Sequence, residues 1–541
     1  MGNTDSFGTF DYIIVGAGSA GSVLANRLSA DPTKRVLVLE AGGNDNWIWF
    51  HIPVGYLFAI GNPRADWLFK TEPVPGLNGR ALAYPRGKVI GGSSAINAMV
   101  YMRGQAADYD GWRQLGLTGW GWDDVLPFFK VHEDHFGPEN EFHSSGGEWR
   151  VEPARISWDI LDRLRDAAES AGVPKIEDFN TGDNTGSAYF QVNQKAGTRW
   201  SAARGFLKPV MNRSNLTVLT EVKVDRVLFE GKRACGIAYS KGGEKFQADA
   251  TAEIVLSAGS VCSPALLEAS GVGDGDRIGN LGIDLVHHLP GVGENLQDHL
   301  QIRPIYKVHG ISTLNVQYHN LFRRALMGVD YALRRRGPLT MAPSQLGAFV
   351  KSSPEYATAN LEFHFQPLSL DDWGEGLHKF SAFTASVCNL RPTSRGSIHL
   401  HSTDPGAAPQ IQPNYLDTET DRQIAAASLQ WCRDIVAQPA LQPYRPEEYK
   451  PGSDIRSQDD LVRAAGDLGT TIFHPVGTAK MGTDDDAMAV TDERLAVRGL
   501  SGLRVIDASV MPNITSGNTN SPTIMIAEKG AAMMIADGKG R

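Results

Sequence analysis

Three glycines near the start of the chain form the first pattern with a definite chemical use. Gly16, Gly18 and Gly21 are spaced as G-x-G-x-x-G, and Glu40 lies 24 residues after Gly16. In this arrangement the first glycine permits a tight turn, the second lets the backbone approach a pyrophosphate, and the third lets a helix pack closely on a strand. An acid at about this distance hydrogen-bonds the ribose hydroxyls. These four residues therefore predict a dinucleotide-binding site.

The residues around these glycines predict the elements that such a site needs. Residues 10–15 (FDYIIV) are a short β-branched and aromatic run, which is typical of a buried strand. Residues 22–29 have the apolar spacing of a helix, and residues 36–39 (VLVL) predict a second buried strand. The N-terminus of the helix would offer N–H donors and partial positive charge to phosphates. This order of strand, turn, helix, strand and acid does not distinguish NAD from FAD.

A second glycine-rich stretch lies at residues 86–97, with the sequence RGKVIGGSSAIN. The adjacent Gly91 and Gly92 precede two serines, which suits a backbone that passes close to a flat or anionic group. A surface turn is the alternative interpretation. Because residues 89–90 and 98–100 on either side are apolar, we expect this turn to lie inside the protein.

Several blocks of the sequence resemble the glucose-methanol-choline (GMC) family of FAD-dependent oxidoreductases. Two blocks match the signature segments of the family, at residues 87–110 (GKVIGGSSAINAMVYMRGQAADYD) and 259–273 (GSVCSPALLEASGVG). Further similar blocks are 290–299 (PGVGENLQDH), 473–478 (FHPVGT), 505–512 (VIDASVMP) and 517–523 (GNTNSPT). The similarity runs from about residue 10 to residue 538, so it covers the whole chain.

The resemblance implies which residues hold FAD. The ADP half would be held by Gly16, Gly18, Ser19, Gly21, Glu40 and Ala41, and adenine would meet the backbone of Val224. The pyrophosphate and flavin would be lined by Arg86, Gly91, Gly92, Ser93, Asn97, Ala98, Met99, Val100, Asp507, Ala508, Asn518 and Thr519. Some relatives attach FAD covalently through a histidine beside the second glycine cluster. Ile96 stands at that place, so we expect non-covalent FAD.

The resemblance also implies a catalytic pair, His474 and Asn518. A lone histidine is more often structural, so this assignment depends on the family. A neutral imidazole titrates near pH 7 and can accept the hydroxyl proton of an alcohol while a hydride leaves its carbon for flavin N5. The Asn518 amide can donate a hydrogen bond to the alkoxide without a change in charge. Two other histidines are candidates: His299 as a cap of a loop beneath the flavin, and His364 as a residue facing substrate.

The fold class expected is a mixed α/β protein with two interleaved domains. A Rossmann-like FAD-binding domain would comprise residues 8–160, 200–310 and 460–541. The substrate domain would comprise residues 161–199 and 311–459, with a largely antiparallel sheet and covering helices. The strands of this sheet are expected at 345–351, 360–366, 380–390 and 396–400, and the helices at 417–440 and 455–466. A final helix is expected at 523–537, with Ser521 as its N-cap and Pro522 in its first turn.

Composition excludes several other classes of protein. The 541 residues include 52 Lys and Arg against 61 Asp and Glu, a net charge of −9, which excludes the basic footprint of a nucleic-acid binder. Hydrophobic residues make up 42 %, too many for a chain disordered along most of its length. The four cysteines, Cys235, Cys262, Cys388 and Cys432, have no metal-site spacing, so we expect neither a metal site nor a disulfide framework.

Partners and location follow from the same features. We expect a small alcohol substrate, an electron acceptor that is either a quinone-type carrier or dioxygen, and a monomer or homodimer. The sparse cysteines suit a reducing cytoplasm, and the polar first nine residues show no secretory signal. No run of roughly 20 apolar residues predicts a membrane span, whereas attachment to a membrane surface stays open.

Three alternative functions remain at this point. A flavin-dependent fatty-acid photodecarboxylase shares this fold but has no need of the pair His474 and Asn518. A flavoprotein kept as a binding module would hold FAD that no alcohol reduces. An NAD enzyme would use the first glycine motif alone and would leave the other blocks unexplained.

Overall fold

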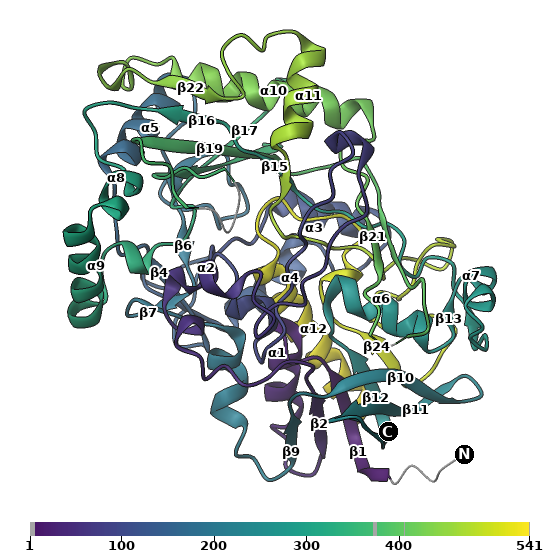
Figure 1. The fold of residues 1–541 in the computed structure, drawn as a ribbon. Coiled ribbons are helices and arrows are strands. Elements are labelled where there is room, and N and C mark those ends of the chain that lie inside the picture. The colour runs from purple at the N-terminus through teal and green to yellow at the C-terminus, as the bar shows by residue number, and fades with distance from the viewer. Residues whose placement is uncertain (1–5, 372–375, 405, 540–541) are drawn as a thin grey trace.

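The computed structural model describes residues 6–371, 376–404 and 406–539. Two large sheets dominate the structure, one in the lower part of Figure 1 and one in the upper part. Each sheet has its own hydrophobic core and its own covering helices. The mixed α/β fold class predicted from the sequence is therefore confirmed.

The first sheet is mainly parallel at its centre. Strand β1 (Ser6–Val15) lies between β2 (Val36–Leu39) and β12 (Glu244–Leu256), and both neighbours run parallel to it. Strand β9 (Leu216–Leu219) adds to β2, and β24 (Leu503–Val505) adds to β12. An antiparallel hairpin, β10 (Lys223–Glu230) and β11 (Arg233–Lys241), completes the other edge. Segments far apart in the chain thus meet in one sheet.

Buried helices cover this sheet. Helix α1 (Ser19–Leu28) packs beside α12 (Asn520–Lys539), which also contacts α4 (Trp122–Lys130). The other helices near this core are α3 (Ala106–Gln114), α6 (Gly259–Ala269) and α7 (Gly275–Asn280). Because β1 and β2 are covered on both faces, their side chains form almost continuous apolar runs, as parallel strands in α/β proteins do.

The second sheet is antiparallel throughout. Its order is β22 (Glu447–Lys450), β16 (Ile305–Lys307), β19 (Ala382–Asn389), β18 (Leu361–Gln366), β17 (Leu346–Val350) and β5 (Gly186–Tyr189). Two short strands, β15 (Leu300–Ile302) and β23 (Thr470–Thr471), extend it beside β19. Helices α5 (Asp159–Ser170), α10 (Glu419–Val436) and α11 (Gln458–Leu468) contribute to its core. The predicted antiparallel sheet with covering helices matches this architecture.

Two details differ from the sequence-based expectations. The strand expected at 396–400 forms as β20 (Ser397–His399), but it pairs with β21 (Gln410–Gln412) outside the large sheet. The last helix begins at Asn520 rather than after Ser521, so Ser521 is not its N-cap. The hydroxyl oxygen of Ser521 is buried without a hydrogen-bond partner.

Strand pairing also bears on the domain division. Strands β15 and β16 lie within the range 200–310 and most of α11 within 460–541, yet the strands hydrogen-bond in the second sheet and α11 packs in its core. We propose that the second cofactor-binding stretch ends near residue 299 and that the third begins near residue 472.

The remaining short strands are β3 (Glu133–His135), β4 (Trp149–Pro153), β6 (Gln191–Val192), β7 (Gln194–Lys195), β8 (Thr198–Arg199), β13 (Val272–Gly273) and β14 (His287–His288).

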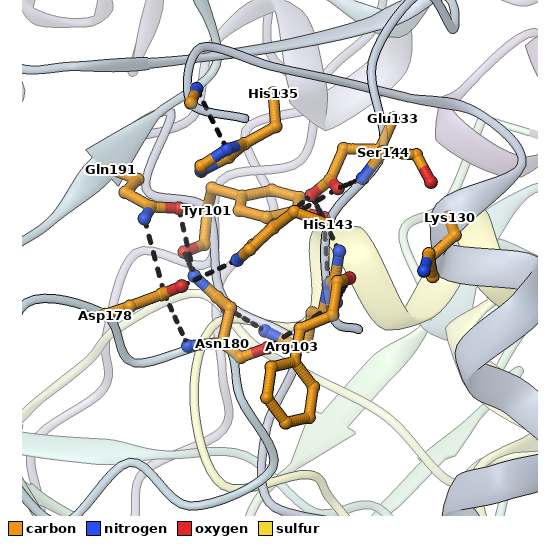
Figure 2. Close-up of polar contacts among 12 residues, drawn as sticks. Tyr101, Arg103, Lys130, Glu133, His135, His143, Ser144, Asp178, Asn180 and Gln191 are labelled. Carbon is orange, nitrogen blue, oxygen red and sulfur yellow. Dashed lines mark hydrogen bonds and ion pairs between the residues drawn. The ribbon is translucent and has the colours of Figure 1, made fainter. Parts of the chain in front are cut away.

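A buried charged network ties three loops together beside the first core (Figure 2). Glu133 accepts hydrogen bonds from Arg103 at 2.7 Å and from His143 Nδ1 at 3.1 Å. The other ring nitrogen of His143 lies 2.6 Å from Asp178. His135 stacks on His143 with ring centroids 3.9 Å apart. A histidine with a carboxylate at each nitrogen is held in its protonated form, since both nitrogens must then donate.

Protonation of His143 should make stability depend on pH. Burial opposes charging of the ring, but the hydrogen bonds to Asp178 and Glu133 raise its pKa above the ordinary value of 6.5. A raised pKa in the folded state contributes stability that is complete below the unfolded pKa and is lost as pH rises through the folded pKa. Above about pH 7 the free energy of unfolding should therefore fall, by up to roughly 1.4 kcal/mol per pH unit.

Denaturant unfolding at pH 6 to 9 would measure this loss. We expect the His143→Gln variant to be less stable at pH 6 and to lose less stability on going to pH 9 than the natural protein. The exposed His401 provides the control, because His401→Gln should keep the natural slope. Equal slopes for His143→Gln and the natural protein would show that His143 is not protonated in the fold.

Candidate active site

One large cavity extends from the first sheet to the second. Its volume is about 2290 Å³, and it is lined by residues from β10 at one end and from β18 at the other. Most of the predicted site residues line it: Gly16, Gly18, Ser19, Glu40, Ala41, Arg86, Gly92, Ser93, Asn97, Ala98, Met99, Val100, Val224, Asp507, Ala508, His474, Asn518 and Thr519. Gly21 and Gly91 are not among the lining residues.

Gly21 and Gly91 shape the backbone behind the cavity. A Cβ atom on Gly21 would lie only 1.8 Å from the carbonyl oxygen of Gly16, so α1 can start this close to the turn only with glycine. Gly91 has φ +90° and packs against Ala203, whose Cβ would be 3.2 Å from a Cβ on Gly91. These two positions therefore act through packing, as the motif predicted for Gly21.

The two glycine-rich turns approach each other backbone to backbone. A Cβ atom on Gly92, which has φ +52°, would lie 2.7 Å from the Cα of Gly18. Gly18 and Gly92 both line the cavity, so bare backbone forms this part of its wall. A wall without side chains lets a pyrophosphate approach the backbone closely.

Glu40 lies at the end of β2 and is 5 % exposed. Its two carboxylate oxygens accept the N–H groups of Ala17, at 2.8 Å, and Gly42, at 2.7 Å. Burial raises the pKa of Glu40 to about 7. Each oxygen keeps a second lone pair, so the carboxylate is fixed in place and can still accept hydrogen bonds from ribose hydroxyls.

Polar atoms without partners collect where α12 begins. The amide oxygen of Asn518 and the amide nitrogen of Asn520 are buried with no hydrogen-bond partner, and both residues line the cavity. Asp507 is already committed to the protein, because its carboxylate accepts from Gly259 N at 2.8 Å and from Ser263 Oγ at 2.6 Å. Unpaired buried polar groups are costly, so those of Asn518 and Asn520 indicate a ligand here.

His474 is joined to two partners, one at each ring nitrogen. Its Nε2 lies 3.0 Å from the Nδ2 of Asn518, and its Nδ1 lies 3.1 Å from the Nδ1 of His299. The Nε2 of His299 in turn lies 3.1 Å from the carbonyl oxygen of Leu390. The predicted pair is therefore together at the cavity. His299 was expected to cap a loop, and instead it contacts His474.

These contacts determine where the protons are. The Leu390 carbonyl can only accept, so His299 must donate through Nε2 and accept through Nδ1. His474 must then donate through Nδ1, which leaves the lone pair on its Nε2. Burial lowers the pKa of His299 and lowers that of His474 well below 6.5, and the positive charge of Arg86 acts in the same direction on His474. His474 is thus a neutral base with Nε2 as its basic atom.

The buried Asp298 and the half-buried Arg86 hold the loop that carries His474. Asp298 accepts the backbone N–H of His474 at 2.8 Å and the hydroxyl of Thr471 at 2.6 Å. The Arg86 guanidinium donates to the carbonyl oxygen of Phe473 at 2.7 Å, and Phe473 itself has φ +70°. The sequence contained Asp298 within the block at 290–299, but nothing in the pattern indicated that it would contact the loop from 470 onward.

Polar side chains of the second sheet form the far wall of the cavity. His364 and Gln366 on β18 and Gln301 on β15 line it, together with Ser344 and Tyr56. His364 thus faces the cavity, as its alternation along the strand indicated. Strand pairing also brings Glu362, His364 and Cys388 together, with potential ligand atoms within 4.8 Å of one another. The spacing of the cysteines along the chain could not reveal this group, because it depends on the register of β18 and β19.

The geometry of these residues fits an adenine dinucleotide with a redox-active ring. The glycine turns leave space for phosphates, Glu40 can bind a ribose, and the unpartnered amides lie beside the histidine base. The family model "GMC oxidoreductase" matches the chain in two parts, residues 10–301 and 392–527. The chain belongs to the GMC oxidoreductase family. Its cofactor is FAD, and it is an oxidoreductase that acts on the CH–OH group of alcohols.

Known GMC proteins resemble this one over nearly their full length. "Alcohol dehydrogenase [acceptor]" of Pseudomonas putida is 42 % identical over 97 % of this chain and 96 % of its own. Mitochondrial choline dehydrogenase of Homo sapiens is 40 % identical over 98 % and 90 %. The crystal structure of pyridoxine 4-oxidase from Mesorbium loti superposes with a TM-score of 0.88 at 32 % identity, over 97 % of this chain and 98 % of that chain.

Substitution of Gly92 should test the cofactor cradle. In Gly92→Ala the new methyl group would press on the Gly18 backbone, so we expect the purified protein to contain at most about a tenth of the natural FAD. The ratio of flavin to protein absorbance measures this occupancy. Gly231→Ala is the control, because Gly231 also has a positive φ, +60°, but has no atoms within 4 Å of an added Cβ. Full FAD occupancy in Gly92→Ala would contradict the close approach of the two turns.

Proposed function

We propose that this protein oxidises a primary alcohol to an aldehyde, with His474 as the general base. The observation that carries the proposal is the neutral His474 with its lone pair at Nε2, 3.0 Å from the Asn518 amide, on the wall of the cavity. FAD, when bound, supplies the oxidant, since N5 of its flavin ring accepts the hydride from the carbinol carbon. We infer that FAD is held non-covalently, because Ile96 offers no nucleophile.

His474 and Asn518 would accept the proton of the alcohol and stabilise its oxygen. The alcohol hydroxyl would displace the Asn518 N–H from the single lone pair on Nε2 of His474 and transfer its proton there, and the freed N–H of Asn518 would donate to the alcohol oxygen. As Nε2 gains its proton, positive charge develops on the ring. The hydrogen bond to Nδ1 of His299 holds the ring in its orientation during this transfer. His364 and Gln366 lie where they would contact the rest of the substrate.

His474→Ala should separate binding from chemistry. Without the base we expect FAD to stay bound and the single-turnover rate of flavin reduction by an alcohol, measured without oxygen, to fall by at least roughly 100-fold. The exposed His309 offers a control, and His309→Ala should reduce its flavin at the natural rate. An unchanged rate in His474→Ala would remove His474 from the mechanism.

The electron acceptor follows from the same experiment when air is admitted. We propose a quinone-type carrier or dioxygen. Rapid return of the oxidised flavin spectrum in air would identify an oxidase, and slow return would identify a dehydrogenase. Names of relatives support both kinds of acceptor, since one is an "alcohol dehydrogenase [acceptor]" and others are "oxygen-dependent choline dehydrogenase".

The charges around the cavity favour an uncharged alcohol over choline. The described carboxylates that line the cavity are Glu40, Glu221, Asp225, Asp284, Asp404 and Asp507, and none of these belongs to the second sheet. The second sheet contributes the neutral amides of Gln301 and Gln366, and a cation, Arg303, donates to the latter at 3.4 Å. Glu362 is fully buried beside His364 and does not line the cavity. A quaternary ammonium would lose water here without gaining a counter-charge.

A pair of isosteric alcohols tests this charge argument. Choline and 3,3-dimethylbutan-1-ol have the same shape, but only choline is charged. We expect the neutral alcohol to have a kcat/KM at least about tenfold higher, since burying an uncompensated charge is costly. A ratio in favour of choline would contradict the charge argument and leave alcohol oxidation itself intact.

A further inference from the structure

Helix α9 (Leu321–Arg334), at the left edge of Figure 1, faces the solvent with its apolar side. Only Met327 and Tyr331 of this helix are buried. Leu333, Leu321 and Phe322 are 79 %, 78 % and 75 % exposed, which makes them the three most exposed large apolar side chains of the part of the chain that is described. An ordinary surface helix does the opposite and turns its apolar face to the core.

The positions of the side chains around α9 show that its apolar face points away from the protein core. At about 100° per residue, Met327 and Tyr331 occupy one narrow stripe. The exposed Leu321, Phe322, Leu326, Val329 and Leu333 fall on the opposite side of the helix, within an arc of roughly 140°. The buried stripe holds the helix through the Tyr331 hydroxyl, which donates to the carbonyl oxygen of Gly197 at 3.2 Å. Nothing in the described chain covers the apolar face.

Positive charge borders this apolar face. Arg323, Arg324 and Arg334 lie on α9 between the apolar arc and the buried stripe, and Arg335 and Arg336 follow directly. Asp330 is the only acidic residue among residues 314–336, where five arginines lie, although the whole chain has a net charge of −9. A helix with apolar side chains on one face and basic residues beside them is typical of segments that lie in the interface of an anionic membrane.

The neighbouring exposed apolar residues belong to elements that reach the cavity. Helix α9 contacts the short turn η7 (Pro338–Thr340), and η7 contacts a second turn, η2 (Pro53–Gly55), which leads into α2 (Tyr56–Ala59). Leu57 and Phe58 on α2 are 50 % and 47 % exposed, while Tyr56 before them lines the cavity. Helix α9 is thus linked through two short turns to an element that lines the cavity.

We propose that α9 docks this protein on the surface of an anionic phospholipid bilayer, with its apolar face among the lipid chains and its arginines at the head groups. None of the helices in residues 6–371, 376–404 and 406–539 is both long and apolar enough to cross a membrane. The attachment is therefore peripheral, and high salt should weaken it because the arginines contribute through charge. It does not depend on which alcohol the enzyme oxidises.

Flotation with lipid vesicles tests this inference. The FAD-loaded full chain would be mixed with vesicles of equal parts phosphatidylcholine and phosphatidylglycerol, or of phosphatidylcholine alone. We expect the protein to float with the anionic vesicles, to float at least fivefold less with the neutral ones, and to detach in 0.5 M salt. The triple variant Leu321→Gln, Phe322→Gln, Leu333→Gln should float at least tenfold less and keep its FAD and its rate of flavin reduction.

A matched control keeps the result specific. Leu115, Val131 and Leu285 are 51 %, 58 % and 50 % exposed on other elements, so their triple substitution by Gln should leave flotation unchanged. Equal flotation of the α9 variant and the natural protein would overturn the proposal, as would no flotation of the natural protein. If the natural protein is instead a dimer that the α9 substitutions dissociate, without binding to vesicles, the face is a contact between two copies and the membrane proposal fails.

Discussion

The active site depends on a chain of hydrogen bonds that begins at a backbone carbonyl deep in the protein. Leu390 O can only accept, and from that one fact the proton positions of His299, His474 and Asn518 follow. The chain works because both imidazoles are buried, which keeps them neutral. If His299 carried an extra proton, its Nδ1–H would point at the Nδ1–H of His474. Burial and hydrogen-bond direction together thus prepare the base at Nε2.

The loop that carries His474 is held by contacts from distant parts of the chain. Asp298, two residues before β15, accepts the backbone N–H of His474 and the hydroxyl of Thr471, and it also accepts from the Tyr84 hydroxyl at 3.1 Å. Tyr415, from the segment before α10, donates to the same carboxylate. Tyr415 belongs to the second core and Tyr84 to a small separate apolar cluster, so residues from distant segments of the chain position the base. A cavity that lies between two sheets needs such ties, because neither core alone surrounds the substrate and the cofactor.

Two parts of the structure differ sharply in how closely they are packed: the glycine turns and helix α9. Around Gly18 and Gly92 the backbones are so close that no side chain fits. Around α9 the apolar side chains have no covering element in the described chain. The bare backbone that these glycines give to the cavity wall fits the pyrophosphate of a dinucleotide, and the uncovered apolar face of α9 fits a lipid surface.

Local patterns in the sequence determined much of this protein. The first strand, turn and helix, the acid at Glu40 and the strands β17, β18 and β19 follow from glycine spacing and side-chain alternation, which act over a few residues. His474, Asn518 and the cofactor residues came from resemblance to a family rather than from the chemistry of isolated residues. Tertiary structure alone decided the partner of His299, the role of Asp298, the grouping of Glu362 with Cys388 and the sheet to which β15 belongs. These contacts join residues from about 25 to 175 positions apart, and no local preference encodes which distant segment a side chain will meet.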